Sequence, residues 1–449
     1  MQGPAKKSDY SSVRLGIKEW SSATPEICPE LLGLSFKEHP EAGEIATQLS
    51  DSHILDVRET LRGLEFEATS WVGRLAFGPV TLTIQPKIDF RSLEVLIRYA
   101  YGLKDLRILI SDTVHELFEQ SLQDLLVTQL EREVGHLVFR GLFRHYVPTE
   151  ATLASPRGRV DFAAIACQGG VRQAALPCKY YPRTENWSHN QLLRAGLRMA
   201  ASLTNDLPLS RRIHRLDSLI PEEVDDIRLS LSSLRDSERR ITRLTEHYRP
   251  AIRIIELLLQ GQGVTLRDGQ DEVRLPGFLF DMNAFWQRLL EQFLSENIRD
   301  AKVRYQASLS DALRYQPDAN PLRRKNPPLR PDFVVTQKNH VVAVLDAKYK
   351  DLWEKSPDAS WLYQMAVYGS AFREKAEAVM LYPSTVEGVT DQRLEIRNPA
   401  TGRLFGVVVL RAVNVSRLVS VIVANDKRMG EKLVDELVFG TPIEKARAA

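Results

Sequence analysis

Two carboxylates and a lysine lie at the ends of two apolar runs in the segment RPDFVVTQKNHVVAVLDAKYK, residues 330–350. Asp332 precedes the first run, and Asp346 and Lys348 come at the end of the second. Side chains alternate along a strand, so Asp346 and Lys348 share a face, and a turn at 337–340 would bring Asp332 close to them. Carboxylates hold Mg²⁺, which lowers the pKa of a bound water, and a lysine positions or deprotonates that water and offsets phosphate charge. The pattern favours phosphodiester hydrolysis, with an ordinary charged strand end as the alternative.

A helix is predicted to follow this hairpin, over about 357–373. Ser356 is a good N-cap, Pro357 suits the first helical position and Asp358 puts an acid in the first turn. Gln364 and Tyr368 are four residues apart and share one face of this helix. The amide and the phenol could orient a water and a DNA phosphate; alternatively, Tyr368 is core packing and Gln364 is solvated.

The elements before this site divide into a β-rich part and a helical part. Alternating apolar residues in LEFEATSWVGRLAFGPVTLTIQPKI, with a turn at Phe77-Gly78-Pro79, predict a β-rich N-terminal domain over 1–105. A mainly helical middle region is expected over 106–275. It contains an amphipathic helix, loop-rich stretches at 152–162 and 177–190, a helix at 190–203, and more helix over much of 221–260 starting at Pro221. The amphipathic helix runs through Val114, Phe118, Leu122, Leu125, Leu126, Leu130, Val134 and Leu137.

A compact α/β domain is predicted over 276–440, after the glycine-rich segment 261–277. A helix at about 282–299, the charged hairpin, the helix with Gln364, and strands around AVMLYP, LFGVVVL and VSVIVAN predict a mixed sheet flanked by helices. Residues 441–449 are expected to be a frayed tail.

Composition narrows the class of protein. A formal net charge of +2 over 449 residues excludes polyanion binding by bulk charge, so any nucleic-acid surface must be local. Three cysteines without a C-x-x-C pair suit a reducing compartment. The start lacks the apolar run of a signal peptide and no apolar stretch is long enough for a membrane span, so we expect a cytoplasmic protein without membrane contact.

The motifs together resemble a known nuclease superfamily. Pro331-Asp332, Asp346-Ala347-Lys348 and Gln364-x-x-x-Tyr368 resemble the PD-(D/E)xK superfamily and its RecB-like branch. More closely, the chain resembles the McrC family, the nuclease subunit of McrBC modification-dependent restriction systems. The matching segments are WVGRLAFGPVTLTIQPKI, GLFRHYV, RGRVDF, residues 178–190, FLFDMNAFW, RPDFVV, DAKYK and LYQMAVY, in the family's order.

This resemblance implies a C-terminal PD-(D/E)xK domain that cleaves double-stranded DNA. Asp332 and Asp346 would hold Mg²⁺ or Mn²⁺, together with the Ala347 carbonyl. Family members often carry a glutamate directly after the aromatic pair of the segment FLFDMNAFW. This chain has Gln287 there, after Phe285 and Trp286, so Glu291 one turn later is a substitute ligand. The catalytic set implied is Asp332, Asp346, Lys348, Gln364 and Tyr368.

The resemblance also implies a hexameric McrB-like AAA+ GTPase partner, docked through residues 1–105, whose hydrolysis this chain stimulates. The chain has no G-x-x-x-x-G-K-[ST], so we expect it to bind no nucleotide itself. Two alternatives remain: a GTPase-activating subunit with a vestigial nuclease, and a freestanding RecB-like nuclease.

A basic run precedes the first strand of the hairpin. Residues 302–330 hold seven basic residues against two acidic ones. Charged runs in loops are usually just solvated. Because this run comes directly before Asp332, we expect Arg323, Arg324, Lys325 and Arg330 to contact DNA phosphates.

Overall fold

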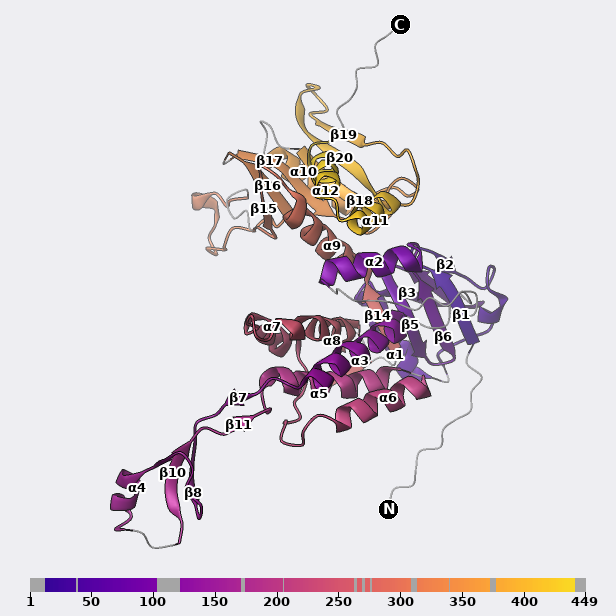
Figure 1. Ribbon diagram of the computed structural model, residues 1–449. Coiled ribbons are helices and arrows are strands. Elements are labelled where there is room, and N and C mark those ends of the chain that lie inside the picture. Colours follow the sequence, from indigo (N-terminus) through magenta and orange to yellow (C-terminus); the bar gives the residue numbers. More distant parts are fainter. Residues whose placement is uncertain are drawn as a thin grey trace. The chain divides into compact units, whose positions relative to one another are not determined.

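The computed structural model places two compact units in this chain (Figure 1). Unit 1 joins Met1–Leu106 to Thr265–Ala449, and unit 2 is Arg107–Val264. The structure describes residues 13–37, 39–102, 122–170, 174–204, 206–261, 265–268, 271–274, 277–307, 313–338, 340–371 and 377–440. The predicted tail and the part of the predicted amphipathic helix before residue 122 lie outside them. The predicted fold class, a multi-domain α/β protein, is confirmed by several sheets and many helices.

Two sheets form the N-terminal part of unit 1, with the orders β1-β6-β5-β14 and β2-β4-β3. The turn predicted at Phe77-Gly78-Pro79 is confirmed, because the strands on either side of it are antiparallel and Gly78 has a φ of +53°. The elements are β1 (Val13–Lys18), β2 (Ser22–Ala23), a 3-10 turn (Pro29–Leu31), α1 (Pro40–Asp51), β3 (Leu55–Thr60), β4 (Gly63–Ala68), β5 (Trp71–Phe77), β6 (Val80–Gln85), α2 (Phe90–Tyr101) and β14 (Gly277–Asp281).

Strand β14 connects this N-terminal sheet to the C-terminal part of unit 1. It pairs antiparallel with β5, with Leu279 opposite Gly73. Gly73 has a φ of +139°, and a Cβ there would lie 2.1 Å from the Phe278 carbonyl oxygen. Only glycine allows so close an approach of the two backbones. Helix α9 (Met282–Asn297) starts directly after β14, and Asp281 caps it by accepting from the backbone N–H groups of Asn283 and Ala284.

The C-terminal part contains the predicted mixed sheet, with the strand order β15-β16-β17-β18-β20-β19. The β15, β16 and β17 strands are antiparallel neighbours, β17, β18 and β20 run parallel, and β19 is antiparallel to β20. Its elements are β15 (Lys302–Tyr305), a 3-10 turn (Pro317–Ala319), β16 (Phe333–Gln337), β17 (His340–Ala347), α10 (Ala359–Ala371), β18 (Glu377–Ser384), β19 (Gln392–Arg397), β20 (Leu404–Asn414), α11 (Val415–Ala424) and α12 (Lys427–Phe439).

Helix α10 packs on this sheet through a buried apolar cluster. Met365 and Tyr368 of the helix meet Val344 of β17, Met380 of β18 and Leu410 of β20. The helix was predicted from about 357 but begins at Ala359, with the Asp358 carbonyl accepting from the backbone of Trp361 and Leu362. Its face toward the sheet is therefore the face that carries Tyr368.

The prediction of a strand at VSVIVAN was wrong, because these residues lie in α11. Asn414 caps the helix by accepting from the backbone N–H of Arg417, and Asn425 ends it in the left-handed conformation. Val415, Leu418 and Val421 are buried at helical spacing. β-Branched residues favour strands only weakly, so the two caps and the burial of one face decide the outcome.

Unit 2 is a helical bundle with an attached arm of short strands (Figure 1). Of the predicted amphipathic helix, the described part is α3, where Leu126, Leu130, Val134 and Leu137 are buried as expected. No helix in the described ranges of either unit is long and apolar enough to cross a membrane. The bundle contains α3 (Leu122–Arg140), α5 (Ser188–Leu203), α6 (Leu207–Ser218), α7 (Leu231–Arg239), a 3-10 turn (Glu246–Tyr248) and α8 (Arg249–Gly261).

The stretches predicted as loop-rich, at 152–162 and 177–190, contain strands instead. The β8, β9 and β10 strands form one small sheet, in which Cys178 lies opposite both Ala151 and Val160. The arm consists of β7 (His145–Tyr146), β8 (Thr149–Leu153), β9 (Arg159–Val160), α4 (Phe162–Cys167), β10 (Leu176–Tyr180) and β11 (Arg183–Thr184), and a separate hairpin of β12 (Thr265–Asp268) and β13 (Asp271–Arg274) lies in the glycine-rich segment. These strands are two to five residues long, too short to show an alternating pattern.

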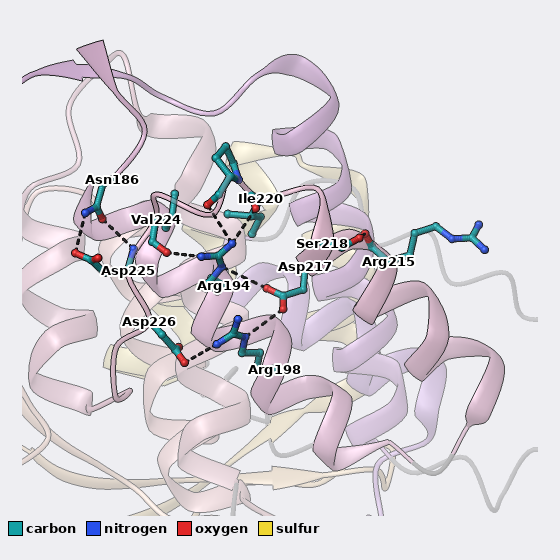
Figure 2. Close-up of polar contacts among 11 residues, drawn as sticks. Asn186, Arg194, Arg198, Arg215, Asp217, Ser218, Ile220, Val224, Asp225 and Asp226 are labelled. Carbon is teal, nitrogen blue, oxygen red and sulfur yellow. Dashed lines mark hydrogen bonds and ion pairs between the residues drawn. The ribbon is translucent and has the colours of Figure 1, made fainter. Parts of the chain in front are cut away.

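The helix predicted over much of 221–260 is present as α7 and α8, but its predicted start at Pro221 was wrong, and Figure 2 shows the reason. The buried guanidinium of Arg194, on α5, donates to the backbone carbonyls of Ile220, Pro221 and Val224. Asn186 accepts from the backbone N–H of Asp225 in the same segment. These side chains satisfy backbone groups that a helix would have paired internally, so residues 221–230 stay non-helical.

Candidate active site

The predicted carboxylates Asp332 and Asp346 lie side by side at one end of the β16 and β17 pair. Phe333 of β16 is paired with Leu345 of β17, which puts the residues beyond them together. The Asp332 carboxylate accepts a 2.8 Å hydrogen bond from the backbone N–H of Ala347. Asp346 is 2% exposed. Burial raises the pKa of both carboxyls, and the charge of Asp346 raises the pKa of Asp332 further.

Lys348 lies just beyond the end of β17 and faces the same pair. Its Nζ is 2.7 Å from Asp346 Oδ2, and its side chain is 20% exposed. Its backbone N–H donates a 3.0 Å hydrogen bond to the Leu381 carbonyl of β18, which fixes the chain at this point. The structure thus brings Asp332, Asp346 and Lys348 together.

Gln364 and Tyr368 meet on one face of α10, as their spacing predicted. Gln364 Nε2 lies 2.9 Å from Tyr368 Oη in a hydrogen bond. The Tyr368 ring is buried in the core cluster, so the packing interpretation holds for the ring. Burial raises the pKa of its phenol, and the charges of Asp346 and Asp332 raise it further. The phenol therefore lies within electrostatic reach of both carboxylates.

Gln287, on α9, contacts the site directly. Its Nε2 donates a 2.7 Å hydrogen bond to Asp332 Oδ1. Glu291, the predicted substitute ligand, is exposed, and its backbone carbonyl accepts from the Tyr305 hydroxyl at 3.3 Å. The structure does not gather Glu291 with the two aspartates: the described residues contain no group of three or more His, Cys, Asp or Glu side chains that could hold a metal.

Trp361 is a residue of this site that the sequence patterns missed. Its ring centroid lies 5.6 Å from Lys348 Nζ and 5.4 Å from Lys350 Nζ. A cation over an indole face is attracted by the ring's quadrupole. Its position three residues before Gln364 on α10 was a usable signal, since i and i+3 lie on one side of a helix.

The donor set fits one hard divalent cation. The carboxylates of half-buried Asp332 and buried Asp346, both with raised pKa values, repel each other, and a cation between them would remove that repulsion. Mg²⁺ commonly takes one or two carboxylates and completes its shell with water and phosphate oxygens. Asp332 and Asp346 would hold it here.

The four basic residues predicted to contact DNA are exposed on the segment that leads into Asp332. Asn320 closes a turn around them: its side chain donates to the Arg324 carbonyl at 2.8 Å and accepts from the Arg324 N–H at 2.9 Å. Within the described part of the chain, none of Arg323, Arg324, Lys325 and Arg330 forms an ion pair. Their charges are available to a polyanion.

A family model described as "McrBC 5-methylcytosine restriction system component" matches residues 66–383, which include every site residue from Gln287 to Tyr368. The chain belongs to the McrBC family. The resemblance to McrC expected from the sequence is therefore confirmed at the level of the family. A search of curated proteins gives no match for this McrBC-family chain.

One solved structure supports the fold of this McrBC-family member. One matching chain comes from the "Refined half-complex from tetradecameric assembly of Thermococcus gammatolerans McrB AAA+ hexamers with bound McrC". It is 18% identical with a TM-score of 0.55, and the match covers 95% of this chain and 100% of that one. A second match, from the "Cryo-EM structure of the Thermococcus gammatolerans McrBC complex", is 19% identical with a TM-score of 0.43 and covers 65% of this chain and 90% of that one.

Proposed function

We propose that this chain is the Mg²⁺-dependent DNA endonuclease subunit of a McrBC-type restriction system. The observation that carries the proposal is the pair of Asp332, which is half-buried, and Asp346, which is buried, with Lys348 Nζ 2.7 Å from Asp346 Oδ2. Carboxylates buried at a strand end cost stability unless they serve a cation, and the neighbouring lysine suits a phosphate substrate. Membership of the McrBC family supports the same assignment.

Each residue of the site has a distinct role in this proposal. Asp332 and Asp346 hold Mg²⁺ or Mn²⁺, which activates water and neutralises charge on the scissile phosphate when bound. Lys348 binds a non-bridging phosphate oxygen and stabilises the charge that develops there. Gln287 keeps Asp332 in one orientation through its 2.7 Å hydrogen bond. Gln364 and Tyr368, bonded at 2.9 Å, orient the attacking water and the phosphate from the α10 side.

DNA reaches this site along the basic segment before β16. Arg323, Arg324, Lys325 and Arg330 are exposed and unpaired within the described residues, and the segment ends at Asp332. Lysine and arginine contacts to phosphates position a duplex without reading its sequence.

The cutting is coupled to a hexameric AAA+ GTPase that this chain binds and stimulates. The fold neighbour with a TM-score of 0.55 comes from an assembly of McrB AAA+ hexamers with bound McrC. The chain carries no P-loop sequence of its own, which is consistent with GTP hydrolysis by a separate polypeptide. Residues 1–105 remain our predicted docking part, and the cytoplasm remains the expected location.

A second candidate is a GTPase activator with a vestigial nuclease. It is favoured by Gln287 standing where a third carboxylate would complete the metal shell, and by the lack of such a third acid among the described residues. The two functions differ in whether the natural chain cuts DNA.

The deciding experiment mixes the full chain with its cognate AAA+ GTPase, GTP, Mg²⁺ and methylated plasmid DNA. We expect linear products with the natural chain and none with Asp346→Ala, while both stimulate GTP hydrolysis equally. Stimulation without cleavage by the natural chain would support the activator instead. Cleavage without GTP or partner would indicate the freestanding nuclease.

A further inference from the structure

The residues directly after β1 of the N-terminal sheet contact the residues directly after Lys348, the lysine of the proposed nuclease site. The Tyr349 hydroxyl donates a 2.9 Å hydrogen bond to Glu19 Oε1, although the two residues are 330 positions apart in sequence. Lys350 Nζ lies 5.4 Å from the centroid of the Trp20 ring. Two consecutive residues, Glu19 and Trp20, therefore hold the two residues that follow Lys348. All of them belong to unit 1.

The burial of the Glu19 carboxyl at this contact is unfavourable in free energy. It is 1% exposed, and Oε1 accepts both the Tyr349 bond and a 2.7 Å bond from the backbone N–H of Lys87. Its Oε2 has no hydrogen-bond partner among the described residues. Burial raises the pKa of its carboxyl to about 7. An apolar residue would fill the space with less loss of free energy, so the carboxylate is retained for what it binds.

Trp20 is held in an unusual backbone conformation. Its φ is +57°, in the left-handed region that residues other than glycine rarely adopt. Three contacts hold it there: its N–H donates to the Thr69 carbonyl at 3.2 Å, its carbonyl accepts from Lys355 Nζ, and Ser21 N–H donates to the Lys18 carbonyl at 3.2 Å. Such strain persists where surrounding contacts over-determine it, and it concentrates at functional sites.

The contact continues from Trp20 to the nuclease lysine through alternating rings and cations. Lys350 Nζ lies 5.4 Å from the ring of Trp20 and also 5.4 Å from the ring of Trp361. Trp361 in turn lies 5.6 Å from Lys348 Nζ, which is 2.7 Å from Asp346 Oδ2. The path from the N-terminal sheet to the carboxylate pair thus contains only adjacent side chains.

Core packing alone does not account for the Glu19 bond. The Tyr349 ring is 2% exposed and packs edge-on against Trp286, with ring centroids 6.3 Å apart. That packing needs only the ring, whereas the hydroxyl reaches outward to Glu19. A small cavity of about 30 Å³, lined in part by Glu19, Trp20, Lys87 and Tyr349, adjoins the contact. The bond between Tyr349 and Glu19 joins the two parts beside this cavity.

We propose that Glu19 and Trp20 are positioning residues of the nuclease site, which hold Tyr349 and Lys350 and thereby set where Lys348 Nζ stands. The inference rests on the proposed nuclease function. It makes the N-terminal sheet a part of the cutting site, since the lysine is placed correctly only while β1 holds the end of the catalytic segment. A misplacement of about 1 Å at such a group can cost about 100-fold in rate.

The test compares Tyr349→Phe, Glu19→Ala and Glu19→Gln in the full chain assembled with its GTPase partner. Tyr99→Phe is the matched control, because the Tyr99 hydroxyl also bonds a glutamate, Glu296, between α2 and α9 in the same unit. Cleavage rate at saturating DNA, KM for DNA, GTPase stimulation and melting temperature are measured for each variant.

We expect Tyr349→Phe and Glu19→Ala to lower the cleavage rate at least tenfold, with KM and GTPase stimulation changed less than twofold. Glu19→Gln should stay within threefold of the natural chain, because its amide oxygen can accept both bonds that Oε1 accepts. Tyr99→Phe should cut normally.

Equal cutting by Tyr349→Phe, Glu19→Ala and Tyr99→Phe would overturn the positioning role, as would a loss with Glu19→Gln as large as with Glu19→Ala. A parallel loss of melting temperature, cleavage and GTPase stimulation would show a purely structural contact and also overturn it. If Glu19→Ala does not fold, the cleavage rates of Tyr349→Phe and Glu19→Gln decide whether the positioning role holds. Absence of cutting by the natural chain would instead reject the proposed nuclease function.

Discussion

The Gln287 amide donates a 2.7 Å hydrogen bond to Asp332 Oδ1, so the residue that replaces the expected glutamate holds a carboxylate in place. A glutamate at this point would add a third negative charge beside two carboxyls whose pKa values are already raised by burial. The amide avoids that repulsion. Position 287 is therefore compatible with a metal held by two carboxylates.

Gln287→Glu should make the stability of the protein depend on metal. Without a divalent ion, the extra buried charge should cost about 1–3 kcal/mol, because no donor compensates it. Mn²⁺ or Mg²⁺ should restore the melting temperature. Thermal unfolding with and without metal measures this, and Gln292→Glu on the same helix is the control. A metal-independent melting temperature in Gln287→Glu would show that position 287 does not face the metal.

Metal should stabilise the natural chain but not Asp346→Asn. An ion that binds only the folded state adds about 2.7 kcal/mol at a concentration 100 times its dissociation constant. The asparagine keeps the shape of Asp346 and removes the negative charge that attracts the ion. Melting curves over a Mn²⁺ titration test this, with Asp358→Asn as an exposed control. Equal shifts of the melting temperature in the natural chain and in Asp346→Asn would place the metal elsewhere.

Stability should fall with rising pH through the titration of Glu19. Its pKa is raised from 4.5 to about 7 by burial, so the folded state holds the proton more tightly than the unfolded state does. The unfolding free energy therefore decreases between about pH 4.5 and pH 7 and keeps that loss above pH 7. The charged groups around this carboxyl are Lys87, Lys350 and Asp351, with the Tyr349 hydroxyl.

Glu19→Gln should remove this part of the pH dependence. Its free energy of unfolding should exceed that of the natural chain at pH 8 and match it more closely at pH 5. Urea unfolding at the two pH values measures the difference. An unchanged pH slope in Glu19→Gln would mean that Glu19 does not titrate in this range.

The basic segment should contribute salt-dependent DNA affinity without sequence preference. Replacing Arg323, Arg324 and Lys325 by alanine removes three phosphate contacts, which should reduce the slope of log affinity against log salt by about 2–3. Binding titrations from 50 to 200 mM salt with methylated and unmethylated duplexes measure this. A charge-matched triple variant at Arg239, Arg240 and Arg243 of unit 2 should change the slope less. Equal slopes in the two variants would contradict a specific role.

The stability of unit 2 should depend on the side chain of Arg194. Its guanidinium is buried and donates to three carbonyls of the segment 220–224 (Figure 2). Arg194→Met keeps most of the volume but leaves these carbonyls unpaired, at an expected cost of about 3 kcal/mol or more. Arg198→Met, at a more exposed ion pair with Asp226, should cost less than about 1 kcal/mol. The two variants are compared by chemical unfolding and then by hydrogen exchange of residues 221–230.

The sequence by itself determined the local parts of the candidate site. Asp332, Asp346 and Lys348 are placed by one hairpin, whose alternation follows from the pleat of a strand. Gln364 and Tyr368 are placed by one helix, whose turn brings residues four apart together. The mixed sheet and the family were also visible in the chain, because both depend on short motifs in a fixed order.

Only the tertiary structure decided the parts that join distant segments. VSVIVAN lies in a helix because the adjacent Asn414 and Asn425 cap it and the fold buries one of its faces. Residues 221–230 stay non-helical because the Arg194 guanidinium, which comes from another helix, satisfies backbone carbonyls of this segment. The Gln287 bond to Asp332 and the Glu19 bond to Tyr349 span 45 and 330 positions. No periodicity in a sequence encodes such pairs, since each is fixed by the packing of whole elements and not by the residues between them.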